Sequence, residues 1–253
     1  MASPGKDLQS QDLHGSVSHR PWPLPPGPWA MTQRWHDLLF AHWAIDPGVM
    51  RGHVPEPLKV DISHRTAWLG IVPFRMSHIH ARGLPELPGL SHFPELNVRT
   101  YVTFDNKPGV YFFSLDAGSM PAVWAARRYY HLPYFHAHMS TGAEGDWITY
   151  ESRRKHGEAA FRARYRPTGP VQLREAGSLI HWLTERYCLY TLVENRIYRA
   201  EIHHRQWPLQ EAEAKIELNT MAGAAGIRQP SDAPLLHFAK ELEVLIWELK
   251  PAE

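Results

Sequence analysis

Proline is the residue type that most limits what this chain can fold into. The sequence has 22 prolines among 253 residues, and they occur along its whole length. Proline has no backbone N–H to donate and its ring clashes with the preceding helical turn, so it breaks helices and favours turns. We therefore expect many short segments joined by turns, and no long helix.

Most of the segments between the prolines favour strands. Residues 66–76, 95–104 and 110–117 are rich in β-branched and aromatic side chains. Further strands are expected at residues 133–139, 147–154, 159–165, 197–206 and 241–247. Apolar residues at helical spacing predict helices at residues 33–44, 119–131, 173–187 and 211–222. The pattern predicts a mainly β (α+β) fold, with a closed or curled antiparallel sheet and a few peripheral helices.

The chain divides into a short tail and one domain. Residues 1–20 are polar and rich in serine and glycine, and we expect a disordered tail there. Residues 21–253 are expected to form a single domain. Its first residues alternate prolines with Trp22 and Trp29, which predicts an extended arm whose tryptophans dock on the body.

Composition excludes several classes of partner. The chain has 27 Lys and Arg residues and 26 Asp and Glu residues, so its net charge is +1. Proteins that bind nucleic acids usually have a concentrated basic face, and this charge balance does not indicate one. The sequence has no apolar run of about 18 residues, so we expect no membrane-spanning helix. The only cysteine, Cys188, lies in an apolar run, which fits a buried residue in a protein of the reducing cytoplasm. We expect a small-molecule ligand, no nucleic acid and no membrane partner; homo-oligomerisation stays open.

Polar side chains alternate along the strand expected at residues 95–104. Glu95, Asn97, Arg99 and Tyr101 share one face, because successive side chains of a strand point to opposite sides. In the ordinary interpretation this row faces water. In the alternative, the row lines a pocket inside a barrel, and the long loop expected at residues 82–94 lies next to it.

Several segments resemble a known family. The run AARRYYHLPY (residues 125–134) has the arginine-to-proline spacing of the acetoacetate decarboxylase motif, with Arg127 and Pro133 at the matching positions. Together with LLFAHWAID, WLGIVPFRM, FPELNVRTYV and GVYFFSLDA, it resembles the YqjF-like family (domain of unknown function 2071) of the acetoacetate decarboxylase-like superfamily. The likeness spans about residues 20–250 and implies a conical antiparallel β-barrel around a ligand pocket.

One departure from the decarboxylase motif changes the expected chemistry. Acetoacetate decarboxylases have two lysines after the proline, and the first forms a Schiff base with the keto acid. Tyr134 and Phe135 occupy these positions here, and neither side chain has a primary amine. The sequence therefore predicts no decarboxylation through an imine, and no cofactor is indicated.

The resemblance and the alternation together give a set of candidate site residues. An acid or base and an oxyanion donor are needed to act on a carbonyl group, and arginine holds a carboxylate with two hydrogen bonds. The candidate catalytic residues are Glu95, Arg127 and Tyr134, and the candidate ligand-binding residues are Asn97, Arg99, Tyr101 and His136.

Three functions remain open from the sequence. The first is an enzyme with lyase- or hydrolase-like chemistry on a small organic acid that carries a carbonyl group. The second is a barrel that binds such a ligand without turnover, and the third is an interaction module with a vestigial pocket. A metal is not expected: the pairs His78-x-His80 and His136-x-His138 lack the further ligands that a site needs.

Overall fold

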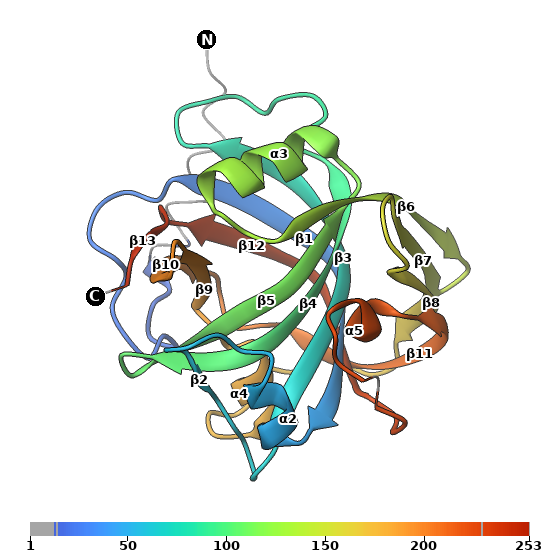
Figure 1. The fold of residues 1–253 in the computed structure, drawn as a ribbon. Helices are drawn as coiled ribbons and strands as arrows, with labels where there is room; N and C mark the ends of the chain where they lie inside the picture. Colours follow the sequence, from blue (N-terminus) through green and yellow to red (C-terminus); the bar gives the residue numbers. More distant parts are fainter. Residues whose placement is uncertain (1–12, 14, 229, 253) are drawn as a thin grey trace.

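The computed structural model describes residues 13, 15–228 and 230–252. Within these described residues, thirteen strands form one sheet, and four short helices, α2 to α5, lie around it (Figure 1). The strands are β1 (Met31–Ile45), β2 (Lys59–Val60), β3 (Ala67–Ala81), β4 (Phe93–Phe104), β5 (Lys107–Ala117), β6 (Tyr134–Glu144), β7 (Trp147–Arg154), β8 (Ala160–Pro167), β9 (Cys188–Val193), β10 (Arg196–His203), β11 (Leu209–Asn219), β12 (Leu235–Ile246) and β13 (Lys250–Pro251). The helices are α2 (Pro47–Arg51), α3 (Met120–Tyr129), α4 (Leu179–Thr184) and α5 (Met221–Ala224).

The sheet closes on itself in two circuits that share strands. The first circuit has seven strands, each paired with the next, in the order β1, β3, β4, β5, β9, β10 and β12. The pairing of β12 with β1 closes it. Strands β6, β7, β8 and β11 connect β5 to β12 by a second route, which closes a nine-stranded circuit with β1, β3 and β4. All these pairs are antiparallel except β5 with β6 and β5 with β9. The predicted β-barrel with peripheral helices is confirmed.

Bulges decide which side chains face the interior of the seven-stranded circuit. Register shifts interrupt the pairing of β1 with β3 near Asp37 and His78, and the pairing of β4 with β5 at Phe113. Asp37 and His78 have the positive φ angles of 52° and 51°. An extra residue reverses the side-chain alternation. Residues on both sides of each bulge therefore face the same interior, among them Trp35, Leu38, Met76, Ile79, Phe112 and Leu115.

Two apolar clusters pack on the two faces of the shared strands. One cluster joins β1, β3 and β4 to β7 and β8, and it includes Leu96, Val98, Tyr150 and Phe161. This cluster fills the nine-stranded circuit. The other cluster surrounds the interior of the seven-stranded circuit and includes Phe40 from β1. The apolar face of β4 is therefore used for packing, which leaves its other face for the cavity described below.

Two of the predicted helices are strands in the structure. Residues 33–44 lie within β1, which pairs with β3 and β12 at its two edges. The two apolar clusters cover its two faces, so most of its side chains are buried or half-buried. Residues 211–219 lie in β11, which pairs with β8, although their Ala, Glu and Lys residues favour helix. Only Leu179–Thr184 of the predicted helix at residues 173–187 is helical, and Cys188 begins a strand, β9, that was not predicted.

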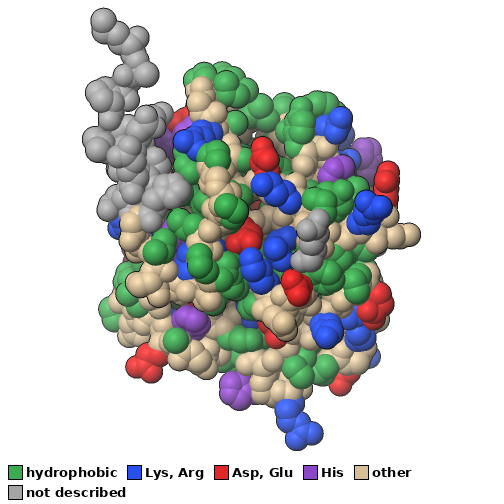
Figure 2. Space-filling view, turned by 90° about the vertical axis from the view of Figure 1, so that its left-hand side faces the viewer, with side chains coloured by type: hydrophobic (Ala, Val, Ile, Leu, Met, Phe, Trp, Pro, Cys, Tyr) green, Lys and Arg blue, Asp and Glu red, His purple; other side chains and the backbone are tan. Residues whose placement is uncertain are grey.

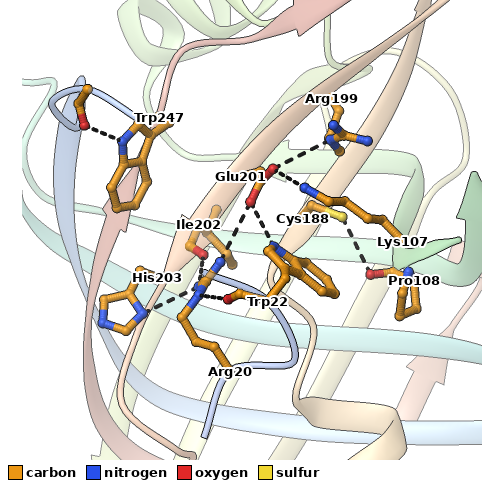
Figure 3. A network of polar contacts seen from close by, with 11 residues as sticks. Arg20, Trp22, Lys107, Pro108, Cys188, Arg199, Glu201, Ile202, His203 and Trp247 are labelled. Carbon is orange, nitrogen blue, oxygen red and sulfur yellow. Dashed lines mark hydrogen bonds and ion pairs between the residues drawn. The ribbon is translucent and has the colours of Figure 1, made fainter. Parts of the chain in front are cut away.

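The N-terminal arm is tied to β10 by a network of polar contacts (Figure 3). Arg20 Nη1 donates to the Ile202 carbonyl oxygen at 2.7 Å, and Trp22 Nε1 donates to Glu201 Oε2 at 2.8 Å. Lys107 Nζ of β5 donates to the other Glu201 oxygen at 2.8 Å. Of the expected disordered tail, residues 1–12 and 14 lie outside the described residues, whereas Arg20 is buried against the barrel.

Helix α3 lies across one end of the barrel, beside the loop of residues 82–92 (Figure 1). Its first turn is capped by Ser119, whose Oγ accepts a hydrogen bond from the Ala122 backbone N–H at 3.3 Å. Hydrophobic side chains gather at this end of the molecule (Figure 2). In the described part of the chain, no helix has the length and apolar character to cross a membrane.

Candidate functional site

A cavity of about 610 Å³ lies inside the seven-stranded circuit. Apolar side chains of the shared strands form most of its wall, and α3 and the loop of residues 84–90 close one end. The polar lining residues are few: Gln33, His80, Glu95, Asn97, Arg99, Tyr129, Tyr130, Tyr134, Thr184, Arg186 and His204. A smaller hollow of about 270 Å³ over β6, β7 and β8 contains none of the predicted site residues. The large cavity is therefore the candidate site.

Glu95 and Tyr134 form a hydrogen-bonded pair in the cavity wall. Tyr134 of β6 reaches across β5 and donates its hydroxyl to Glu95 Oε2 at 2.7 Å. The backbone explains this approach, because Leu115 of β5 pairs with Asn97 on one side and with Tyr134 on the other. The Glu95 side of β4 is further fixed by Tyr150, whose hydroxyl donates to the Glu95 carbonyl oxygen at 2.7 Å.

Burial raises the pKa of the Glu95 carboxyl from 4.5 to about 8. The hydrogen bond from Tyr134 opposes this shift, and the negative charge of Asp116 adds to it. Asp116 is itself buried and bound by Arg154, whose Nη2 lies 2.6 Å from Asp116 Oδ1. Burial and Glu95 raise the pKa of Tyr134 well above 10, so Tyr134 stays protonated and remains a donor. The pair therefore holds an acid that changes charge near neutral pH.

Asn97 and Arg99 continue the polar row along β4. Both line the cavity, on the face that the alternation assigned to them together with Glu95. Asn97 Oδ1 and Arg99 Nε are buried atoms that make no hydrogen bond with the described residues. The Arg99 guanidinium lies 5.5 Å from the Phe40 ring centre and 5.8 Å from that of Tyr101. Buried polar atoms of this kind are costly unless a ligand or water binds them.

Arg186 is a second cavity arginine, and sequence reasoning missed it. Its Nη1 donates to Asp61 Oδ2 at 2.6 Å, and its guanidinium stacks 4.2 Å from the Trp182 ring centre. Arg186 Nη2 is buried without a partner among the described residues. The residue follows α4 directly, in a segment expected to be helical, so no pattern in the sequence placed it beside β4.

Tyr101 lies behind the cavity lining rather than in it. It is fully buried, its hydroxyl is 2.7 Å from His42 Nε2, and its ring centre is 4.9 Å from the Arg186 guanidinium. Burial, together with the charge of Arg99, lowers the pKa of His42 well below its ordinary value, so this histidine is neutral. Tyr101 supports both cavity arginines through its ring and does not reach the cavity itself.

Arg127 and His136 are not brought to the cavity. Arg127 is exposed on α3, and its Nε donates to the Tyr134 backbone oxygen at 2.6 Å, which positions Tyr134 but leaves the guanidinium outside. His136 lies on β6 beyond Tyr134, with its ring 6.0 Å from that of His138. Neither residue is in the cavity lining. The structure therefore does not bring the candidate catalytic residue Arg127 together with Glu95 and Tyr134 in the cavity, because α3 directs its side chain toward the backbone of β6.

The comparison with protein families identifies the chain. The model of the DUF2071 family, described as an uncharacterized conserved protein, matches residues 32–243. The chain belongs to this family. The uncharacterized protein YqjF of Bacillus subtilis (strain 168) is 50% identical over 228 residues, which are 90% of this chain and 94% of that protein. The predicted membership is confirmed.

The fold of this DUF2071 member is similar to that of acetoacetate decarboxylases. The crystal structure of the acetoacetate decarboxylase from Legionella pneumophila subsp. pneumophila str. Philadelphia 1 has a TM-score of 0.67 at 11% identity, over 95% of both chains. The enduracididine biosynthesis enzyme MppR complexed with pyruvate has a TM-score of 0.61 at 10% identity, over 92% of this chain and 93% of that chain. These likenesses show the fold.

The DUF2071 cavity lacks the amine that imine chemistry needs. Among the described residues, no lysine lines the cavity, and Tyr134 takes the place of the motif lysine. Cys188 lines it, but burial raises the pKa of its thiol to about 11, so it is a poor nucleophile. His204 also lines it, and burial lowers its pKa to about 3. Among the described residues that line the cavity, Glu95, Tyr134, Arg99 and Arg186 therefore remain as the candidates for chemistry or ligand binding.

Proposed function

We propose that this protein binds a small carbonyl-containing organic acid in the cavity and exchanges a proton with it through Glu95 and Tyr134, without forming an imine. The observation that carries the proposal is the 2.7 Å hydrogen bond between Tyr134 and a buried Glu95 carboxyl. A buried acid with a pKa of about 8 exists in both protonation states near neutral pH. This is the property that a general acid or base requires.

The two members of the pair have different roles in this proposal. Tyr134 keeps its single hydroxyl proton and donates it to Glu95 Oε2, which stabilises the ionised form of Glu95. Ionised Glu95 removes a proton from the carbon next to the ligand carbonyl, and the electron pair of the broken C–H bond moves into the carbonyl group, which becomes an enolate. Neutral Glu95 then returns a proton from Oε1 to the same carbon, so the exchange leaves the ligand and both side chains unchanged.

The arginines and the apolar wall indicate the shape of the ligand. Arg99 Nε and Arg186 Nη2 are buried donors without partners among the described residues, and guanidinium groups bind carboxylates well. Most other lining residues are apolar, including Phe74, Phe112 and Trp207. We infer that the ligand has an anionic end at the arginines and an apolar body along the barrel.

The structural neighbours agree with this ligand class. MppR, whose fold is similar, was crystallised with pyruvate, which has a carboxylate next to a ketone. The neighbour from Legionella pneumophila is an acetoacetate decarboxylase. For the present chain the absence of a cavity lysine among the described residues favours proton transfer over Schiff-base chemistry.

Pyruvate and longer 2-oxo acids are the probes for the test. The melting temperature should rise with the probe in the wild type and rise much less in Arg99→Met, since a ligand that binds only the folded state stabilises it. In heavy water, the wild type should exchange the protons next to the ketone for deuterium, and Glu95→Gln should bind the probe without exchange. Failure of every 2-oxo acid to raise the melting temperature, or a borohydride-trapped adduct, would overturn the proposal.

A binding function without turnover is the second candidate. The observation that favours it is the predominantly apolar wall, which suits retention of a ligand as well as catalysis. The same experiment separates the two candidates. A rise in melting temperature that depends on Arg99, with no deuterium exchange in the wild type, would identify a binding protein.

A further inference from the structure

Three side chains converge beside the loop that covers one end of the cavity. His78 lies in β3, Glu86 in the loop of residues 82–92, and His92 just before β4. Each offers one ligand atom, and the three atoms lie within 4.8 Å of one another. His78 Nδ1 is 2.9 Å from Glu86 Oε1, and the rings of His78 and His92 are 5.4 Å apart between centres.

The donor set and its spacing suit a divalent metal ion. Two imidazole nitrogens and one carboxylate oxygen form a known three-residue zinc set, with water in the fourth position. Ligand atoms on a tetrahedral ion with bonds of about 2.0 Å lie about 3.3 Å apart. The separation of 2.9 Å between His78 and Glu86 is near this value, and the ligand atom of His92, which is exposed and free to turn, lies within 4.8 Å of both.

The local backbone explains why the sequence did not indicate this cluster. The sequence pattern pairs His78 with His80, but the bulge at His78, where φ is 51°, reverses the alternation. His80 lines the cavity instead, and its Nδ1 is 3.1 Å from the His78 carbonyl oxygen. His78 is thereby turned toward Glu86 and His92, which lie 8 and 14 positions further along the chain.

We propose that His78, Glu86 and His92 bind one divalent transition-metal ion of the zinc type, which fastens the loop of residues 82–92 to β3 and β4. Leu84, Leu87 and Leu90 of this loop line the cavity. An ion bound to Glu86 would hold these side chains over the opening. The site lies outside the Glu95–Tyr134 pair and does not depend on the proposed chemistry.

Zinc chloride titrated into metal-free, untagged protein tests the proposal by calorimetry. We expect one ion per chain, and an affinity reduced by more than roughly tenfold in both His92→Ala and Glu86→Gln. His64→Ala is the matched control, because His64 is an exposed histidine outside the cluster and should bind zinc as the wild type does. Melting curves without zinc establish that each variant is folded.

Tryptic cleavage after Arg82 gives a second readout that reports on the loop itself. Arg82 is exposed at the start of the loop. Zinc should slow cleavage there in the wild type and in His64→Ala, and should have no effect in His92→Ala. Absence of a saturable site with one ion per chain, or zinc binding that both cluster variants retain, would overturn the proposal.

Discussion

Tyr134 donates a hydrogen bond of 2.7 Å to Glu95 from a strand that is not adjacent in the sheet. Strand β5 lies between the two residues and pairs antiparallel with β4 and parallel with β6. In the segment that resembles the acetoacetate decarboxylase motif, Tyr134 stands at the position of the first lysine, so this segment has a phenol in place of an amine. The consequences of this pairing can be measured.

Two substitutions should move the pKa of Glu95 in opposite directions. Tyr134→Phe removes the hydrogen bond that lowers this pKa, so the pKa should rise. Asp116→Asn removes a negative charge that raises it, so the pKa should fall. Infrared difference spectra of the carboxyl band against pH give both values. Tyr130→Phe, which also changes a cavity tyrosine, is the control; equal shifts in all three variants would contradict the assigned causes.

The stability of the wild type should fall between pH 5 and pH 9 more than that of Glu95→Gln. In this range the folded protein retains a proton on Glu95 that the unfolded chain, with a pKa of 4.5, has released. The folded state binds more protons, so its stability decreases as pH rises. A shift from 4.5 to about 8 corresponds to about 4–5 kcal/mol. Urea unfolding at several pH values measures the free energy of unfolding of both proteins. The same dependence of this free energy on pH in the two proteins would disprove a raised pKa of Glu95.

Longer apolar chains on a 2-oxo acid should bind more tightly. Each buried methylene contributes about 0.8 kcal/mol, which is a gain of about fourfold in affinity per carbon until the cavity is filled. Calorimetric titration of a homologous series from pyruvate upward measures the gain. An affinity that does not change along the series would mean that the apolar wall does not contact the ligand.

Arg20→Ala should destabilise the fold although Arg20 lies outside the barrel strands. Its side chain is 1% exposed, donates to the Ile202 carbonyl oxygen and lies 3.6 Å from the partly buried Glu201, so its loss removes a buried hydrogen bond and an ion pair. We expect a loss of about 3 kcal/mol in the free energy of unfolding, as for other broken buried ion pairs. Chemical denaturation measures it. Arg128→Ala, on the exposed side of α3, should stay within about 0.5 kcal/mol of the wild type.

The sequence predicted the hairpin of β4 and β5 well because local signals agree there. The strand predicted at residues 95–104 lies within β4, and its alternation placed Glu95, Asn97 and Arg99 on one face, which in the structure lines the cavity. By contrast, β1 has apolar residues on both faces because it is covered on both sides, and such a run also fits a helix. Strand β11 is helical by propensity and extended only because β8 pairs with it.

Only the part of the site that lies on a single strand could be predicted from the sequence. Residues of one strand share a face, and this relation can be read from the sequence, whereas contacts between distant segments cannot. Arg186 and His204 reach the cavity through the closure of the barrel by β9 and β10, which leaves no local pattern. Arg127 matched a motif, but its direction depends on how α3 packs on β6.

The titration of the Glu95 side chain is the decisive measurement. Carbon-13 labelling of glutamate, with Glu95→Gln to assign the signal, allows the carboxyl carbon to be followed by NMR across the pH range. We expect a midpoint at about 8 in the folded wild type. A midpoint near 4.5 would mean that Glu95 is ionised at neutral pH, and it would contradict the proposed proton exchange.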